Sequence, residues 1–127
     1  MAKILVVDDS MVARMCHIAS IPKDQGHEIA EASDGLSALE AFRAMEPDVT
    51  FLDLTMPGMN GLDVLAAIKE DYPNAVVIVC TADIQRQTLE MVEKLGAFGV
   101  LSKPCSKEVL QEKLARALEK AEQNRDE

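Results

Sequence analysis

The sequence predicts an α/β fold, in which five parallel strands form one sheet with helices on both of its faces. Short apolar runs recur at regular intervals along the chain. Amphipathic helical patterns separate the runs, and strands that alternate with helices pair in parallel through right-handed crossovers. The expected strands lie near residues 4–7, 28–32, 49–52, 76–80 and 99–102.

The strands differ in their patterning, which indicates their places in the sheet. The runs at 4–7, 49–52 and 76–80 are almost wholly apolar, as strands covered on both faces are. The run at 28–32 alternates polar and apolar residues, which favours an edge strand. We therefore expect a doubly wound sheet in the strand order 2-1-3-4-5.

The helices are predicted from apolar residues that recur at helical spacing. Pro22 removes a backbone donor, so the first helix should end early or kink near residues 18–21. Asn60 and Ser106 are the expected N-caps of the third and fifth helices. The polar tail 121–127 should fray. The expected core-facing residues of the second to fifth helices are Ala38, Phe42 and Met45; Val64, Leu65, Ile68 and Tyr72; Ile84, Thr88, Met91, Val92 and Leu95; and Leu110, Leu114, Ala117, Leu118 and Ala121.

Length and composition exclude several classes of protein. A chain of 127 residues is expected to form one domain over residues 1–127. It has no apolar run of about 18 residues, and its first strand starts too early for a targeting peptide, so we expect a cytoplasmic protein without a membrane span. The net charge of −9 and the scarcity of aromatic residues argue against nucleic-acid binding and suit basic protein partners.

The three cysteines predict reduced thiols in a cytosolic compartment, because their number is odd and their spacing is wide. A metal site built from Cys16, His17, Cys80 and Cys105 is an alternative, but the sequence has no CxxC pair to support it. Cys80 ends an apolar run and is expected to act as a small buried hydrophobic residue.

Polar residues follow four of the predicted strands and form one chemical set. Asp8 and Asp9 follow the first strand and Asp53 the third, while Thr81 and Lys103 follow the fourth and fifth. The carboxyl ends of parallel strands meet at one edge of the sheet, where ligands bind at the point of reversal between the first and third strands. The sequence therefore predicts a site at this edge.

These residue types point to a divalent cation and a phosphoryl group. Each carboxylate pair about 4 Å apart repels by about 4 kcal/mol at an effective dielectric near 20, so a cluster of three needs positive charge nearby. Lys103 supplies one charge, and Mg²⁺, which prefers oxygen ligands, supplies two. Asp53 is then a candidate nucleophile, with Thr81 and Lys103 binding phosphoryl oxygens. Any one of these residues alone commonly has a structural role. A purely structural role does not explain why all of them follow strand ends.

Five fragments, in order and spacing, resemble the receiver domain of two-component response regulators, the CheY-like family. The resemblance runs from residue 3 to about residue 120 and implies a flavodoxin-like fold. The fragments are Ile4-Leu5-Val6-Val7-Asp8-Asp9-Ser10, Ala32-Ser33-Asp34-Gly35, Phe51-Leu52-Asp53-Leu54-Thr55-Met56-Pro57-Gly58-Met59-Asn60-Gly61, Thr81-Ala82 and Ser102-Lys103-Pro104.

The resemblance implies a role for each site residue. Asp53 would accept a phosphoryl group from a phosphohistidine on a sensor histidine kinase or phosphotransfer protein. Asp9, Asp53 and the backbone carbonyl of Thr55 would ligate Mg²⁺ directly, and Asp8 would assist through water. The peptide bond before Pro104 would be cis.

The resemblance also implies a phosphorylation switch, in which Thr81 moves toward the new charge. The output protein would bind the fourth helix, fifth strand and fifth helix, at residues 84–96, 98–102 and 106–120. Val100 stands where the family usually carries an aromatic switch residue, and strand parity places Phe98 on the same face as a partial substitute. Thr55 and Asp83 occupy the positions that influence hydrolysis of the phosphoryl group.

The preferred function is a stand-alone, phosphorylation-switched signalling module rather than an enzyme. Chemotaxis-like motor control, phosphorelay transfer and enzyme regulation all remain open. A phosphatase of the haloacid dehalogenase type is the alternative, but it needs an Asp where this chain has Thr55, and no cap domain fits this length. A flavin binder shares the strand order, but acidic strand ends would repel its phosphate.

Overall fold

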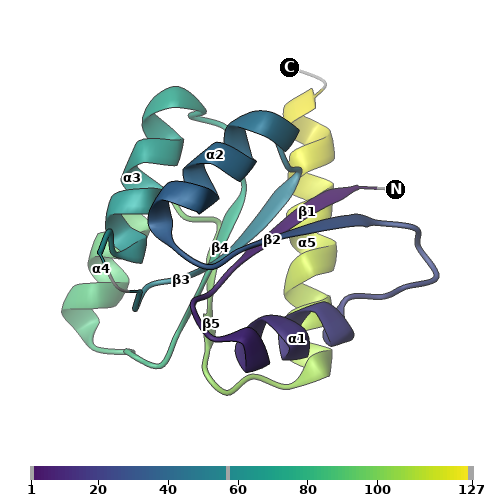
Figure 1. Ribbon diagram of the computed structural model, residues 1–127, viewed down its shortest axis with the longest axis horizontal. Coiled ribbons are helices and arrows are strands. Elements are labelled where there is room, and N and C mark those ends of the chain that lie inside the picture. Colours follow the sequence, from purple (N-terminus) through teal and green to yellow (C-terminus); the bar gives the residue numbers. More distant parts are fainter. Residues whose placement is uncertain (1, 57, 126–127) are drawn as a thin grey trace.

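The computed structural model describes residues 2–56 and 58–125, over which five strands and five helices alternate (Figure 1). All four strand pairs are parallel, and the sheet order is β2-β1-β3-β4-β5, as the sequence predicts. The elements are β1 (Lys3–Val7), α1 (Met11–Ser20), β2 (Glu28–Ala32), α2 (Gly35–Met45), β3 (Val49–Asp53), α3 (Gly61–Asp71), β4 (Val77–Thr81), α4 (Arg86–Lys94), β5 (Gly99–Ser102) and α5 (Lys107–Arg125).

The sheet separates two hydrophobic cores, because successive side chains of each strand point to opposite faces. On one face, Leu5 and Leu52 pack with residues of α2, α3 and α4. On the other face, Ile4 and Phe51 pack with residues of α5 and with Ile21, which follows α1. Figure 1 shows the same division, with α1 and α5 lying apart from the other three helices. Both faces of the central strands are therefore covered, which explains their wholly apolar sequences.

Three helix ends agree with their predictions, two of them through capping hydrogen bonds. The first helix ends at Ser20, two residues before Pro22. Asn60 accepts a hydrogen bond from the backbone N–H of Asp63 at 3.0 Å. Ser106 accepts one from the N–H of Val109 at 3.1 Å. The two side-chain oxygens accept hydrogen bonds from N–H groups of the first helical turn, which have no partner within the helix.

The tail differs from its prediction, because α5 continues to Arg125 instead of fraying at residue 121. Ala121 is buried against the sheet, and Asn124 donates from Nδ2 to the Asn74 carbonyl at 2.8 Å. These two contacts hold the last turns of α5 against the rest of the domain. Residues 126–127 of the predicted tail, and Pro57 of the third fragment, lie outside the described residues.

The prediction for α4 is wrong at its start. The helix begins at Arg86, so Ile84 precedes it and is 62% exposed, while Met91 is 45% exposed. Asp83 accounts for the late start, because its carboxylate accepts hydrogen bonds from the Gln85 N–H and from the Thr88 hydroxyl. The Thr88 side chain therefore makes a hydrogen bond at the start of the helix instead of packing in the core. Val92 is the fully buried residue of this helix.

No helix in the described part of the chain is long and apolar enough to cross a bilayer.

Candidate functional site

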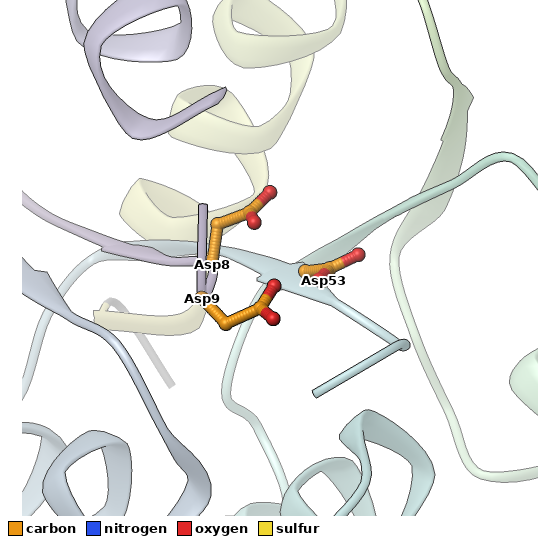
Figure 2. A group of neighbouring side chains, drawn as sticks. All are labelled: Asp8, Asp9 and Asp53. Atoms are coloured by element: carbon orange, nitrogen blue, oxygen red, sulfur yellow. The ribbon is translucent and has the colours of Figure 1, made fainter. Parts of the chain in front are cut away.

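Three carboxylates gather at the carboxyl ends of β1 and β3, which are neighbours in the sheet. Their register pairs Val7 with Leu52, so Asp8 and Asp53 follow at adjacent strand ends. One oxygen from each of Asp8, Asp9 and Asp53 lies within 4.8 Å of the other two (Figure 2). Asp8 and Asp53 are buried, whereas Asp9 is exposed to solvent. The three side chains form the Asp cluster, which is accessible from one side.

The turn after β1 holds Asp8 through both its side chain and its backbone. Oδ1 of Asp8 accepts a hydrogen bond from the Ser10 N–H at 2.9 Å, and the Asp8 N–H donates to the Ala32 carbonyl at 3.1 Å. Ser10 in turn caps α1 by accepting from the N–H of Ala13. Arg14 donates from Nη1 to the Asp8 carbonyl at 2.6 Å. The pair Asp8-Asp9 is therefore fixed between the strand and the first turn of α1.

Lys103 joins two of these carboxylates from the loop after β5. Its Nζ lies 2.7 Å from Oδ2 of Asp8 and 3.0 Å from Oδ1 of Asp53. The Lys103 N–H donates to the Thr81 carbonyl at 2.8 Å, which anchors the loop to the end of β4. The peptide bond between Lys103 and Pro104 is cis, as expected. Lys103 thus contacts two of the three carboxylates, and its single positive charge leaves the Asp cluster with excess negative charge.

The pKa values of the site residues are shifted by opposing effects, burial and the charge of neighbouring groups. Burial raises the pKa of Asp53 and the Asp8 charge adds to it, although hydrogen bonding and charge from Lys103 oppose the shift. Burial lowers the pKa of Lys103, but the hydrogen bonds and charges of Asp8 and Asp53 outweigh it, so the pKa is raised. Lys103 is therefore a firmly charged ammonium beside an acceptor whose negative charge is costly to bury.

Carboxylate oxygens held this close fit a hard divalent cation. The cluster contributes only oxygen atoms, which are the ligands that such ions prefer. Asp9 faces solvent, so an ion bound there would retain access to water. The uncompensated charge beside Lys103 supplies the electrostatic reason for a cation to bind. The Asp cluster is thus a candidate metal centre.

The remaining predicted residues lie around this cluster in different ways. The Thr81 side chain is buried at the end of β4, and its Oγ1 accepts from the Asp83 N–H at 2.9 Å. Thr55 is exposed, and its backbone lowers the pKa of Asp53 slightly against the effect of burial. Asp83 uses both carboxylate oxygens at the start of α4, and the Gln85 N–H and the Thr88 hydroxyl lower its pKa.

Gly61 has a role at the site that the sequence pattern did not reveal, since it appeared there only as the last residue of the third fragment. A Cβ at this position would lie 2.3 Å from the Asp53 carbonyl oxygen and 2.5 Å from Cα of Leu54. The Gly61 N–H also donates to the Leu54 carbonyl at 2.9 Å. Only glycine lets α3 begin directly against the strand end that carries Asp53.

The expectation that Phe98 shares a face with Val100 is wrong. Val100 is half-buried in the core beneath α4, whereas Phe98 packs into the core on the opposite face of the sheet. The strand β5 begins only at Gly99, so the alternation of strand residues does not extend to Phe98. Phe98 therefore does not replace an aromatic switch residue at position 100.

The cysteines do not form the alternative metal site. Cys16 is exposed and Cys105 half-buried, and Cys80 is a buried residue of β4 whose thiol pKa is raised by burial. Among the described residues, the Asp cluster is the one group of histidine, cysteine and carboxylate side chains with ligand atoms close enough to share an ion. The expectation that Cys80 acts as a small core residue is confirmed.

Comparison with known proteins places the chain in a known family. The family model for the response regulator receiver domain matches residues 4–115. A chemotaxis protein CheY from Listeria monocytogenes is 40% identical over 122 residues, covering 95% of this chain and 98% of that protein. One from Thermotoga maritima is 38% identical over 103 residues, covering 80% and 85%.

Solved structures agree with the sequence matches. The chemotaxis protein CheY4 of Vibrio cholerae has a TM-score of 0.85 at 32% identity, and the match covers 93% of this chain and 99% of that one. Neither kind of comparison supports the phosphatase alternative, since the family match is to a signalling domain. The chain belongs to the response regulator receiver domain family and is a CheY-like receiver of two-component signalling.

Proposed function

We propose that Asp53 accepts a phosphoryl group from a phosphohistidine on a sensor histidine kinase or phosphotransfer protein, and that the modified protein signals to an output partner. The observation that carries this proposal is the position of Asp53, which lies beside Asp8 and Asp9 and 3.0 Å from Nζ of Lys103. A buried carboxylate flanked by a cation and by metal-binding oxygens is equipped to attack phosphorus and to stabilise the resulting charge.

The transfer balances as a single displacement at phosphorus. An oxygen of the Asp53 carboxylate forms a bond to phosphorus, and the bond between phosphorus and the donor imidazole nitrogen breaks. The imidazole leaves with the electron pair, and the product is an acyl phosphate on Asp53. Mg²⁺, when bound, neutralises phosphoryl oxygens. In our proposal Asp9, Asp53 and the Thr55 carbonyl hold the ion, and Asp8 assists through water.

Lys103 and Thr81 bind the phosphoryl oxygens in this proposal. The Lys103 ammonium already contacts the acceptor oxygen, so it needs only a short shift to reach an added phosphoryl group. The Thr81 hydroxyl is engaged with the Asp83 N–H, and turning it toward Asp53 would release that contact. Movement of Thr81 would thereby connect phosphorylation to the loop that starts α4.

The output partner is proposed to bind the surface formed by α4, β5 and α5. Exposed apolar side chains near this surface include Ile84, Met91 and Val109, which are 62%, 45% and 49% exposed. Because α4 follows the loop that Thr81 and Asp83 hold, a change at Thr81 would alter this surface. We propose a cytoplasmic, chemotaxis-like pathway as the first to test, since two chemotaxis proteins CheY are matched over most of their length.

The test is incubation of the purified protein with Mg²⁺ and acetyl phosphate, followed by intact-mass measurement. We expect the mass of one phosphoryl group to be added to the wild type and to the matched control Asp24→Asn, which changes an exposed loop carboxylate. Asp53→Asn should gain none. Equal labelling of Asp53→Asn, or no labelling of the wild type, would refute Asp53 as the acceptor.

A further inference from the structure

A second pocket lies at the end of the sheet opposite the Asp cluster. It has a volume of about 360 Å³ and lies where β4 and β5 begin, between the end of α3 and the last turns of α5. Figure 1 shows both helix ends on this side of the sheet. The five residues of β4 separate it from Thr81 by roughly 16 Å of strand. The pocket is therefore distinct from the proposed phosphorylation site.

Two lysines line this pocket, and no carboxylate does. Lys69 comes from α3 and Lys120 from α5, and the other polar side chains in the lining are Asn74 and Asn124. In the part of the chain that the structure describes, neither lysine has a carboxylate oxygen within 4.0 Å. The protein has a net charge of −9, yet two of its lysines line one pocket that contains no carboxylate.

The two ammonium groups are close enough to affect each other. Burial lowers the pKa of Lys69, and the positive charge of Lys120 lowers it further. Lys69 is half-buried, and its Nζ donates to the Ala75 carbonyl at 2.9 Å, so it cannot simply move away into solvent without losing that bond. The two like charges repel each other, and an anion bound between them would offset that repulsion.

The walls of the pocket are preformed. Asn124 donates to the Asn74 carbonyl at 2.8 Å, which ties the last turn of α5 to the loop before β4. The Lys69 side chain passes so close to Gly96 that a Cβ there would lie 3.0 Å from Cε of the lysine. Phe98 and Pro73 add apolar surface beside the lysines. Polar and apolar groups in one small pocket suit an anion attached to an organic group.

We propose that this pocket binds a small phosphate-bearing anion, with Lys69 and Lys120 contacting the phosphate oxygens. Two ammonium groups supply the charge that a phosphate dianion needs, and Phe98 in the lining offers apolar surface to an organic substituent. The shared chemistry is the phosphate group, which either inorganic phosphate or a nucleoside monophosphate would supply.

The test is a titration of the isotope-labelled full chain, followed by NMR, without Mg²⁺ so that the Asp cluster is not loaded. Inorganic phosphate and a nucleoside monophosphate are added separately, with chloride at equal ionic strength as the reference. We expect saturable shifts of the backbone signals of Gly96, Ala97 and Phe98. Tighter binding of the nucleotide would identify the organic phosphate as the preferred source, and equal binding would identify phosphate alone.

Lysine substitutions distinguish binding of the anion at a specific site from its general electrostatic attraction to the protein surface. Lys120→Gln changes an exposed residue and should keep the fold, yet we expect it to raise the Kd at least about tenfold, since a hydrogen bond to a charged group is lost. Lys69→Gln should do the same. Lys23→Gln makes the same charge change in an exposed loop and should leave the Kd unchanged. Non-saturating shifts, or equal weakening by Lys23→Gln, would overturn the proposal.

Discussion

Arg14 donates a hydrogen bond from Nη1 to the backbone carbonyl of Asp8 at 2.6 Å. The same guanidinium donates from Nε to the Glu31 carboxylate at 2.9 Å, and the Arg14 side chain is only 14% exposed. One side chain on α1 therefore fixes the backbone of the acidic turn and ties it to β2. A residue that orients a ligand-bearing turn affects metal binding without touching the metal.

We predict that Arg14→Gln weakens Mg²⁺ binding by about tenfold, because the turn that carries Asp8 and Asp9 loses its support. Arg14→Lys should restore part of the affinity, since it keeps one charged donor. Isothermal titration with MgCl₂ measures both. Arg116→Gln, which removes an exposed arginine paired with Glu112, is the control. Unchanged Mg²⁺ affinity in Arg14→Gln would show that the contact serves the fold alone.

Asp9→Asn should have opposite effects with and without the metal. Without Mg²⁺, removing one charge from the Asp cluster relieves repulsion, and we expect the free energy of unfolding to rise by about 1 kcal/mol, a small value because Asp9 is exposed. With Mg²⁺, the wild type should gain stability and the variant should not. Urea denaturation at several Mg²⁺ concentrations tests this, with Asp24→Asn as the matched control. Equal stabilisation of both proteins by Mg²⁺ would contradict a role for Asp9 in metal binding.

Gly61→Ala should destabilise the protein by about 3 kcal/mol, since its Cβ would meet backbone atoms that cannot move aside cheaply. The comparison is Gly26→Ala, where φ is +67° and the added Cβ has open space, so only backbone strain of about 1 kcal/mol is expected. Urea denaturation gives both values. If the two variants lost equal stability, close approach of α3 to Asp53 would not be the reason for glycine at position 61.

His17 should make the fold sensitive to mild acid. Burial lowers the pKa of His17 below its usual 6.5, and the charge of Lys103 adds to the effect. The unfolded chain therefore binds more protons than the folded protein between the folded pKa and 6.5. Stability from the neutral imidazole is complete above pH 6.5 and is lost as the pH falls toward the folded value.

The measurement is the free energy of unfolding between about pH 7 and pH 5, the range in which a histidine titrates. His17→Gln should flatten the decline relative to the wild type. His27→Gln removes the other histidine of the chain and should leave most of the decline in place. A decline of equal steepness in wild type and His17→Gln would rule out His17 as its source.

The sequence predicted the sheet order and the gathering of Asp8, Asp9, Asp53 and Lys103, because strand ends follow directly from apolar runs. Contacts made by long side chains were not predictable in this way. Arg14 reaches both the turn after β1 and the strand β2, and no local pattern marks which arginine on a helix does so. Apolar periodicity also predicted the wrong start for α4. It included Ile84 in the helix, but the hydrogen bonds to Asp83 outweigh that periodicity.

The side of the sheet on which Phe98 packs was missed for a related reason. Alternation assigns faces only inside a strand, and one residue of uncertainty at the start of β5 reverses the assignment. Gly61 and the pair Lys69 and Lys120 depend on where one element approaches another in space. Such approaches are properties of packing, and the sequence spacing alone does not contain them.

The ion pairs of Lys103 span 95 residues to Asp8 and 50 residues to Asp53. The first, third and fifth strands must all be in place before this lysine reaches its partners. A chain that has folded only in its first half would bring Asp8 and Asp53 together but would lack the lysine that offsets their charge. The complete arrangement therefore forms only when the C-terminal strand has joined the sheet.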